Sequence, residues 1–235
     1  STLSPAYVPF IKHAYDAGID VGNGTNGWEW EPEKIEQVLP YLTWVRFTVA
    51  AGRPNTYADM MYKGPEQTQV FDRAMANIKY AVDLKRRKSL PVTLGIQMVL
   101  MPGMGEEILP FAQLGIDLGV DYAVIKHCSD DEQGSLAIDY SKYDEMYSSL
   151  EKAEAMSTDN TKIIVKWDKI RDGDKPPYKR YYGPQFLLQI SGSGLVAPSG
   201  MFFNARYSKF HIGNFTEAVS YTHLRAHETD SYLVC

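Results

Sequence analysis

Short apolar runs alternate with amphipathic segments from residue 5 to about residue 168. Nearly continuous apolar runs predict buried β-strands, and apolar positions at helical spacing predict amphipathic helices. The predicted strands cover 19–27, 44–49, 92–100, 121–127 and 162–167. The predicted helices cover 5–18, 31–42, 68–88, 105–119 and 141–156, and a long loop is predicted at 51–64.

This alternation indicates an α/β fold. Strands that are apolar at most positions are typical of a parallel sheet buried on both faces. Strand–helix–strand units of this kind build either a doubly wound sheet or an α/β barrel. In both folds ligands bind at the carboxyl ends of the strands. We therefore expect functional side chains within 24–27, 48–53, 98–102 and 126–131.

The character of the sequence changes after about residue 170. Segment 171–185 is rich in proline, glycine and charge, as linkers are. Segment 186–203 predicts a β-hairpin turning at Ser191–Gly194, a run that lacks the lysine and the strand–helix context of a phosphate-binding loop. We expect a barrel part over 1–168, a small hairpin module over 169–217 and a tail over 218–235.

Composition is that of an ordinary globular protein, with 44% apolar and 23% charged residues. A net charge of −5 argues against a nucleic-acid partner, and the basic run Lys85–Lys88 stands where a helix should end, a position that favours cations. Two cysteines exclude a disulfide framework and indicate a reducing, cytoplasmic setting. No apolar stretch is long enough to predict a membrane span. The first residues contain neither an initiator methionine nor a signal core, so we expect them to come from the interior of a longer protein.

Two predicted strands carry polar candidates at or near their ends. Thr25 and Asn26 stand beside glycines that let a ligand approach the backbone, although a tight turn explains them equally well. Arg46 and Thr48 alternate on one strand and therefore point the same way. A partly buried arginine needs an anion or carbonyl groups, which favours a carboxylate or phosphate partner over a structural ion pair.

A third candidate group ends the strand 121–127. It consists of Lys126, His127 and Cys128, which precede an acidic loop. A ligand contact and a structural role explain these residues about equally well. Cys128 has no other cysteine near it, so the sequence predicts no metal site made by protein groups alone.

In this order, the motifs GTNGW, VRFTVAAGRPNTY, FDRAMANIKYAV and LGVDYAVIKH resemble the radical S-adenosylmethionine (radical SAM) enzymes over about residues 1–168. The resemblance implies a partial (β/α) TIM-like barrel with a small C-terminal β-hairpin module. It also implies that the intact enzyme uses a 4Fe–4S cluster to cleave SAM to a 5′-deoxyadenosyl radical, which abstracts hydrogen from a substrate. The family's CxxxCxxC and Gly-Gly-Glu-Pro motifs are absent. The chain is therefore expected to lack the first β/α units, to hold no cofactor alone and to be inactive by itself.

The same resemblance implies roles for individual residues. Thr25, Asn26, Arg46 and Thr48 would contact SAM, and so would Val99 and Leu100, on the side of its adenine. Lys126 and His127 would face the substrate or SAM. The substrate, a small molecule or a peptide, is not indicated, and the electron donor would be of the flavodoxin or ferredoxin type.

The segment after residue 177 is similar to the start of a SPASM or twitch extension, which holds auxiliary iron–sulfur clusters. Tyr181 and Ser199 stand where that pattern expects cysteine ligands, and neither side chain suits such a cluster. An auxiliary cluster is therefore not expected, and the hairpin is expected to serve as structure.

The last residues contain His223 and His227, a spacing that on a helix would suit zinc. Read back into codons, however, VSYTHLRAHET and LVC resemble a transposon-type sequencing adapter and the primer that follows it. We interpret residues from about 218 onward, including Cys235, as translated adapter and leave them out of the fold.

Two other classes of function fit the residues. A cofactor-free α/β barrel, such as an aldolase or an isomerase, would use Lys126 or Lys166 as an amine nucleophile. A degenerate binding module without catalysis is suggested by Tyr181 and Ser199 in place of cysteines.

Overall fold

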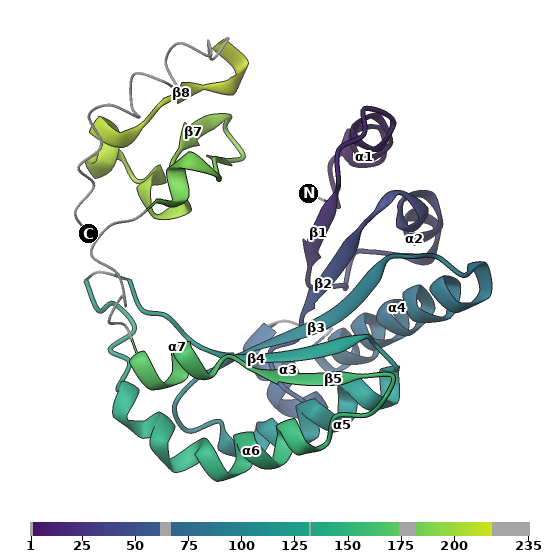
Figure 1. The fold of residues 1–235 in the computed structure, drawn as a ribbon, viewed down its shortest axis with the longest axis vertical. Helices are drawn as coiled ribbons and strands as arrows, with labels where there is room; N and C mark the ends of the chain where they lie inside the picture. The colour runs from purple at the N-terminus through teal and green to yellow at the C-terminus, as the bar shows by residue number, and fades with distance from the viewer. Residues whose placement is uncertain (1, 62–66, 132, 174–181, 218–235) are drawn as a thin grey trace. The chain divides into compact units, whose positions relative to one another are not determined.

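The computed structural model describes residues 2–61, 67–131, 133–173 and 182–217 (Figure 1). The chain divides into two compact units, residues 1–174 and 175–235. Within the described ranges, no helix combines the length and the apolar character that crossing a membrane requires.

A five-stranded parallel sheet forms the centre of the first unit. Its strands are β1 (Gly22–Thr25), β2 (Trp44–Thr48), β3 (Thr93–Leu100), β4 (Tyr122–His127) and β5 (Lys162–Val165). They are hydrogen-bonded in sequence order, β1-β2-β3-β4-β5. A doubly wound sheet reverses its strand order to place helices on both faces. The unreversed order decides between the two predicted architectures, because it is that of a barrel segment, and the expected partial barrel is confirmed.

The helices cover one face of this sheet (Figure 1). They are α1 (Tyr7–Asp16), α2 (Pro32–Val38), α3 (Pro54–Met61), α4 (Gln67–Lys88), α5 (Ile108–Leu118), α6 (Tyr147–Ala155) and α7 (Trp167–Asp172), with 3-10 turns η1 (Leu39–Tyr41), η2 (Gly105–Glu107) and η3 (Tyr140–Met146). Helix α3 lies in the segment that the sequence predicts to be a loop. Helix α7 begins where the sequence predicts the last strand to continue, since β5 ends at Val165.

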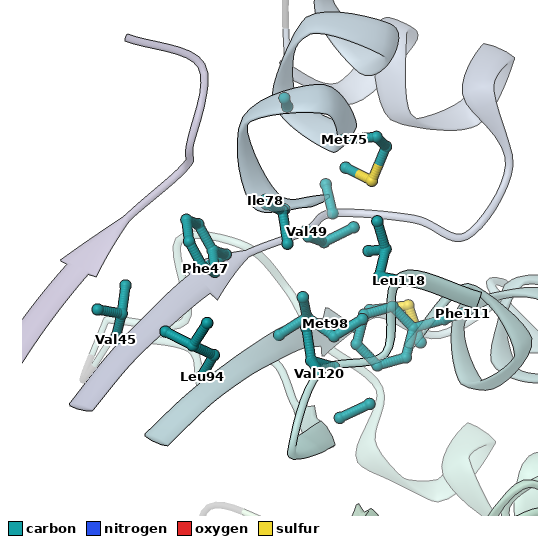
Figure 2. Close-up of a cluster of buried hydrophobic side chains, with 14 of the residues drawn as sticks. Val45, Phe47, Val49, Met75, Ile78, Leu94, Met98, Phe111, Leu118 and Val120 are labelled. Atoms are coloured by element: carbon teal, nitrogen blue, oxygen red, sulfur yellow. The ribbon is translucent and has the colours of Figure 1, made fainter. Parts of the chain in front are cut away.

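The core lies between the sheet and these helices. Alternate strand residues Val45, Phe47, Leu94, Ile96 and Met98 are fully buried. Figure 2 shows residues of β2 and β3 packed against side chains of α4 and α5. Burying an aliphatic or aromatic side chain contributes about 1.5–3 kcal/mol. This apolar layer therefore fixes which face of each strand is free for other contacts.

The opposite face of the sheet carries none of the described helices, and we call it the open face (Figure 1). Its side chains alternate with the core residues along each strand, as the two-residue period of a strand requires. Trp44, Arg46, Thr93 and Lys162 on this face are exposed, whereas Gln97 and Val124 in its middle are buried. The expectation of a sheet buried on both faces is therefore met only at the centre of this face.

The described part of the second unit is a small antiparallel sheet. Its strands β6 (Gln189–Ile190), β7 (Leu195–Ala197) and β8 (Gly213–Asn214) are joined in that order. β6 and β7 pair across Ser191–Gly194, which confirms the predicted hairpin. The sequence does not predict β8, because a strand of two residues leaves no period by which to find it.

Candidate functional site

The carboxyl ends of β2, β3 and β4 lie side by side and bring polar groups together on the open face. Thr48 of β2 is the register partner of Gln97 of β3. Further toward the carboxyl end, Val99 of β3 is the partner of Lys126 of β4. A hydroxyl, an amide, an apolar surface and an ammonium group thus occupy adjacent positions at one end of the sheet.

Aromatic rings cover the opposite end of the open face. A side chain at Gly95 would collide with the ring of Tyr122, so the ring lies over this glycine. Arg46 is stacked on Trp44, with its guanidinium carbon 5.6 Å from the ring centroid. Arg46 therefore has a π partner within the protein, and its charge has no carboxylate partner in the described part of the chain.

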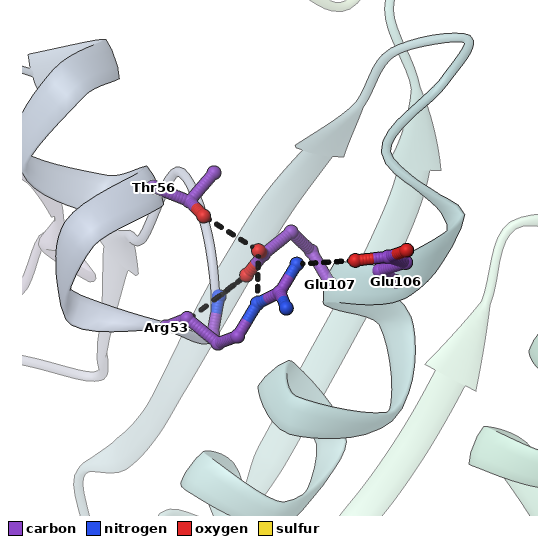
Figure 3. Close-up of polar contacts among 5 residues, drawn as sticks. Arg53, Thr56, Glu106 and Glu107 are labelled. Atoms are coloured by element: carbon purple, nitrogen blue, oxygen red, sulfur yellow. Dashed lines mark hydrogen bonds and ion pairs between the residues drawn. The ribbon is translucent and has the colours of Figure 1, made fainter.

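The loops after β2 and β3 are joined by the carboxylate of Glu107, which is 1% exposed (Figure 3). Its Oε2 accepts hydrogen bonds from the backbone N–H groups of Gly52 and Arg53, both at 2.9 Å. Its Oε1 accepts from Arg53 Nε at 2.6 Å and from Thr56 Oγ1 at 2.7 Å. The buried charge is therefore fully bonded, and it holds the start of α3 against the start of α5.

Two opposing effects set the protonation of this carboxylate. Burial raises the pKa of Glu107, but the hydrogen bonds from Thr56 and Arg53 and the charge of Arg53 outweigh it, so the pKa lies below its ordinary value of 4.5. Glu107 is consequently ionised at neutral pH. Gly52 is required beside it, because a Cβ there would collide with the backbone of Phe111.

The turn after β1 is held from behind by α4. Asn77, 6% exposed, donates from Nδ2 to the carbonyl oxygens of Gly27 at 2.9 Å and Trp28 at 3.1 Å. Thr25 Oγ1 accepts from the N–H of Gly27, and Asn26 Oδ1 accepts from the N–H of Trp28. Both candidates at this strand end thus form the tight turn that the sequence allows as an alternative.

The ends of β3 and β4 are joined by the fully buried Tyr143. Its hydroxyl donates to the carbonyl oxygen of Leu100 at 2.6 Å and accepts from the N–H of Cys128 at 3.1 Å. Burial raises the pKa of Tyr143 to about 12, so the hydroxyl stays protonated as a donor. The carboxyl ends of the two strands are therefore fixed relative to each other.

The loop after β4 is closed by its own acidic residue. The carboxylate of Asp130 accepts from the N–H groups of Asp131 at 2.8 Å, Leu136 at 2.9 Å and Ile138 at 3.2 Å. The hydroxyl of Tyr140 accepts from the N–H of Asp130 at 2.9 Å. These bonds give Asp130 a role in the internal structure of the loop.

Neighbouring candidates fall on opposite faces of their strands. Val99 and Lys126 lie on the open face, whereas Leu100 and His127 are buried on the helix side. The ring of His127 packs edge-on to Tyr140 and Tyr143, with centroids at 5.5 and 6.0 Å. The structure therefore brings Thr48, Val99 and Lys126 together and places Leu100 and His127 behind them.

Positive charge gathers at the end of β4. Burial lowers the pKa of Lys126, and the charges of Lys169 and Arg46 lower it further. Burial also lowers the pKa of His127, again with help from Lys169 and Lys126. Burial and Asp130 raise the pKa of Cys128, which makes this thiol a weak nucleophile at neutral pH.

The described residues do not fit an iron–sulfur cluster. Such clusters are held by cysteine thiolates. Over 2–61, 67–131, 133–173 and 182–217 the structure has one cysteine, Cys128, and no group of three His, Cys, Asp or Glu side chains that would hold a metal ion. Ser199 lies in the second unit, before the 3-10 turn Gly200–Phe203. Tyr181, His223, His227 and Cys235 lie outside the described residues.

Sequence reasoning missed two residues of this region. Gln97 is hidden within the apolar run of β3, although one amide in such a run is a signal for a polar contact on that face. Glu107 stands within a predicted helix start. No local pattern reveals that its carboxylate bonds to residues more than fifty positions earlier.

Comparison with solved structures finds this fold in several enzymes. SuiB of Streptococcus suis bound to S-adenosylmethionine matches with a TM-score of 0.67 and 14% identity, over 99% of this chain and 53% of that one. SuiB bound to its precursor peptide SuiA matches with a TM-score of 0.67 and 14% identity, over 98% and 52%. The native anSMEcpe structure with bound AdoMet matches with a TM-score of 0.58 and 14% identity, over 90% and 57%.

These proteins are radical SAM enzymes, and this chain spans about half the length of each. No protein-family model and no curated protein matches the sequence. The likeness, at 14% identity, is one of fold. The parallel sheet and its helices have the partial-barrel fold of radical SAM enzymes.

Proposed function

We propose that this chain is the part of a radical SAM enzyme that binds SAM and faces the substrate, within a longer protein that supplies the iron–sulfur cluster. The observation that carries the proposal is the match of almost the whole chain to SuiB solved with SAM. The polar groups at the carboxyl ends of β2, β3 and β4 support it, because barrels of this kind bind their ligands there.

The open face has groups suited to the parts of SAM. Thr48 and Gln97, side by side in register, can hydrogen-bond sugar hydroxyls. Val99, next along β3 on the same face, offers an apolar surface of the kind on which a purine packs. We also propose that two further side chains contact SAM: Asn26 in the turn after β1, and Arg46, which is stacked on Trp44.

Thr25, Leu100 and His127 are assigned a supporting role in this proposal. Thr25 bonds the turn after β1, and Leu100 and His127 are buried behind the strands. SAM bound on the open face would supply the deoxyadenosyl group with which radical SAM enzymes take a hydrogen atom from a substrate. The residues of this chain would orient the two reactants and exclude water.

SAM binding tests the proposal directly. The sequence alone predicts that the isolated chain holds no cofactor, but the proposed contacts to SAM all lie within the described part of this chain. We therefore now expect calorimetric titration of the purified chain with SAM to show binding. Thr48→Val should weaken that binding about threefold to tenfold, since the variant loses one hydrogen bond and keeps its volume. Thr93→Val is the matched control, because Thr93 is on the same face at the other end of β3. Absence of SAM binding to the unchanged chain, or an equal effect of both variants, would contradict the proposal.

A peptide is one supported class of substrate, because one of the similar structures contains a precursor peptide. An electron donor of the flavodoxin or ferredoxin type belongs to the proposal for the intact enzyme, as does a cytoplasmic location. A degenerate binding module stays the alternative if SAM fails to bind.

The lowered pKa of Lys126 favours a second candidate function, that of a cofactor-free barrel enzyme with an amine nucleophile. Treatment with borohydride and small aldehydes or ketones separates the two. Covalent labelling confined to Lys126 or Lys166 would favour imine chemistry, and an unlabelled chain that binds SAM would favour the first function.

A further inference from the structure

The side chains on the five strands that are charged at neutral pH are all cations. β2, β4 and β5 carry Arg46, Lys126 and Lys162, and none of the strands contains aspartate or glutamate. All three cations alternate with core residues and therefore lie on the open face. This face is positive in a chain whose net charge is −5.

Ion pairing differs between the two sides of the sheet. The ion pairs of the described residues join helices and loops, as in Arg73 with Glu31 at 2.6 Å and Lys85 with Asp121 at 2.6 Å. None of them includes a strand residue. The cations of the helices and loops therefore include several that are paired with carboxylates. Within the described ranges, the three cations of the open face have no carboxylate partner.

Lys126 is the least exposed of the three cations on the strands. It is half-buried, at the end of β4, and it meets like charge from α7. α7 packs against β4 and buries its Ile170 in the core, and the charge of its Lys169 lowers the pKa of both Lys126 and His127. Lysine residues of two elements that pack together, β4 and α7, therefore stand at the carboxyl end of the sheet. Holding like charges together costs free energy that a bound anion would offset.

We infer that Lys126 and Lys169 form an oxyanion-binding site for a carboxylate or phosphate group carried by the substrate. Lysine ammonium groups bind such groups as point charges with several donors. This inference rests on the proposed function, since it names the chemical class of the substrate for the same face. Arg46 acts at longer range by adding positive potential, because its guanidinium is stacked on Trp44.

The test uses the full chain with its lysines reductively methylated with carbon-13, so that each dimethylamine gives an NMR signal. Lys126→Gln and Lys169→Gln assign the two signals and serve as test variants. Lys152→Gln is the matched control, because Lys152 is an exposed lysine of α6 in the outer helical layer. The probes are inorganic phosphate, a short glutamate-rich peptide, its glutamine counterpart and SAM.

We expect phosphate or the acidic peptide to shift the Lys126 and Lys169 signals and leave Lys152 unchanged. Either Gln substitution should lower the affinity for that probe about tenfold to a hundredfold, as expected for losing a hydrogen bond to a charged group. The neutral peptide should not bind. The acidic peptide binding more tightly than phosphate would identify a peptide-borne carboxylate, and the reverse order would identify a small phosphorylated substrate.

Two results would overturn the inference. One is an equal response of Lys126, Lys169 and Lys152 to the anions, which would mean non-specific attraction. The other is a loss of SAM affinity in Lys126→Gln as large as the loss of anion affinity, which would assign Lys126 to SAM itself. If SAM did not bind the unchanged chain, the proposed function would fail, while the anion titration would still decide whether this site exists.

Discussion

Replacing Glu107 by Gln removes one buried negative charge and changes the volume of the side chain very little. The carboxylate accepts four hydrogen bonds, from two backbone N–H groups, Arg53 Nε and Thr56 Oγ1. The amide keeps one acceptor oxygen and turns an NH₂ group toward the donors on the other side. An unsatisfied buried donor costs about 1–3 kcal/mol. The Thr56 hydroxyl can turn and accept from the NH₂ group, whereas the Nε–H of the half-exposed Arg53 loses both its acceptor and its ion pair. We expect a total loss of about 2–4 kcal/mol.

The loss should depend on pH in a defined direction. Because the folded pKa of Glu107 lies below its ordinary value of 4.5, its stabilisation is complete above pH 4.5 and is lost as the pH falls through the folded pKa. The difference between the chain and its Glu107→Gln variant should therefore be full at neutral pH. It should shrink below about pH 4.5, where protonated Glu107 comes to resemble glutamine.

Urea denaturation followed by circular dichroism at neutral pH and at successively lower pH measures this difference. Glu106→Gln is the control, since Glu106 is 84% exposed and bonds Arg53 through one oxygen at 3.0 Å. That variant should lose no more than about 0.5 kcal/mol at any pH. Equal losses in the two variants, or a loss in Glu107→Gln that stays constant down to low pH, would refute the account of this carboxylate.

Two further side chains behind the open face give testable expectations. Asn77→Ala removes both hydrogen bonds to the turn after β1 and should lower the free energy of unfolding by about 2 kcal/mol. Urea denaturation measures the loss, with Lys79→Ala on the exposed side of α4 as control. Equal losses in the two variants would contradict the role of Asn77 in holding the turn. Tyr143→Phe removes the hydroxyl that bonds the ends of β3 and β4 and should lower the melting temperature by about 4–8 °C. The control Tyr15→Phe changes an exposed tyrosine and should leave the melting temperature unchanged. Similar shifts in both variants would contradict a stabilising role for the Tyr143 hydroxyl.

Apolar runs allow the five strands to be predicted from the sequence, and helical spacing of apolar residues allows most of the helices to be predicted. α3 is missed because Tyr57 and Ala58 are its only buried residues, too few to show a helical period over eight residues. α7 is missed because the strand predicted over KIIVKW includes Trp167, the first residue of the helix. The strand ends at Val165, and the Trp167 indole then donates to Glu154 in α6 at 3.0 Å, a contact that no local pattern reveals.

The candidate site is predicted less well, for a reason that the sequence itself contains. Consecutive residues of a strand point to opposite faces, so Lys126 cannot share a face with His127, nor Val99 with Leu100. Strand periodicity applied to these adjacent candidates is enough to separate them. The effect of Lys169 on Lys126 cannot be found in this way, because it depends on the packing of α7 against β4.

The two kinds of loop at the carboxyl ends of the strands differ in how they could be exchanged between related proteins. The loop after β4 is closed largely by bonds that Asp130 makes to its own segment, so it could be transplanted as a single cassette. The loops after β2 and β3 share the carboxylate of Glu107 and would have to be transferred as a pair. Chimeras that replace only one of that pair would leave either a buried charge or two backbone donors without partners, however well the new loop suited its substrate.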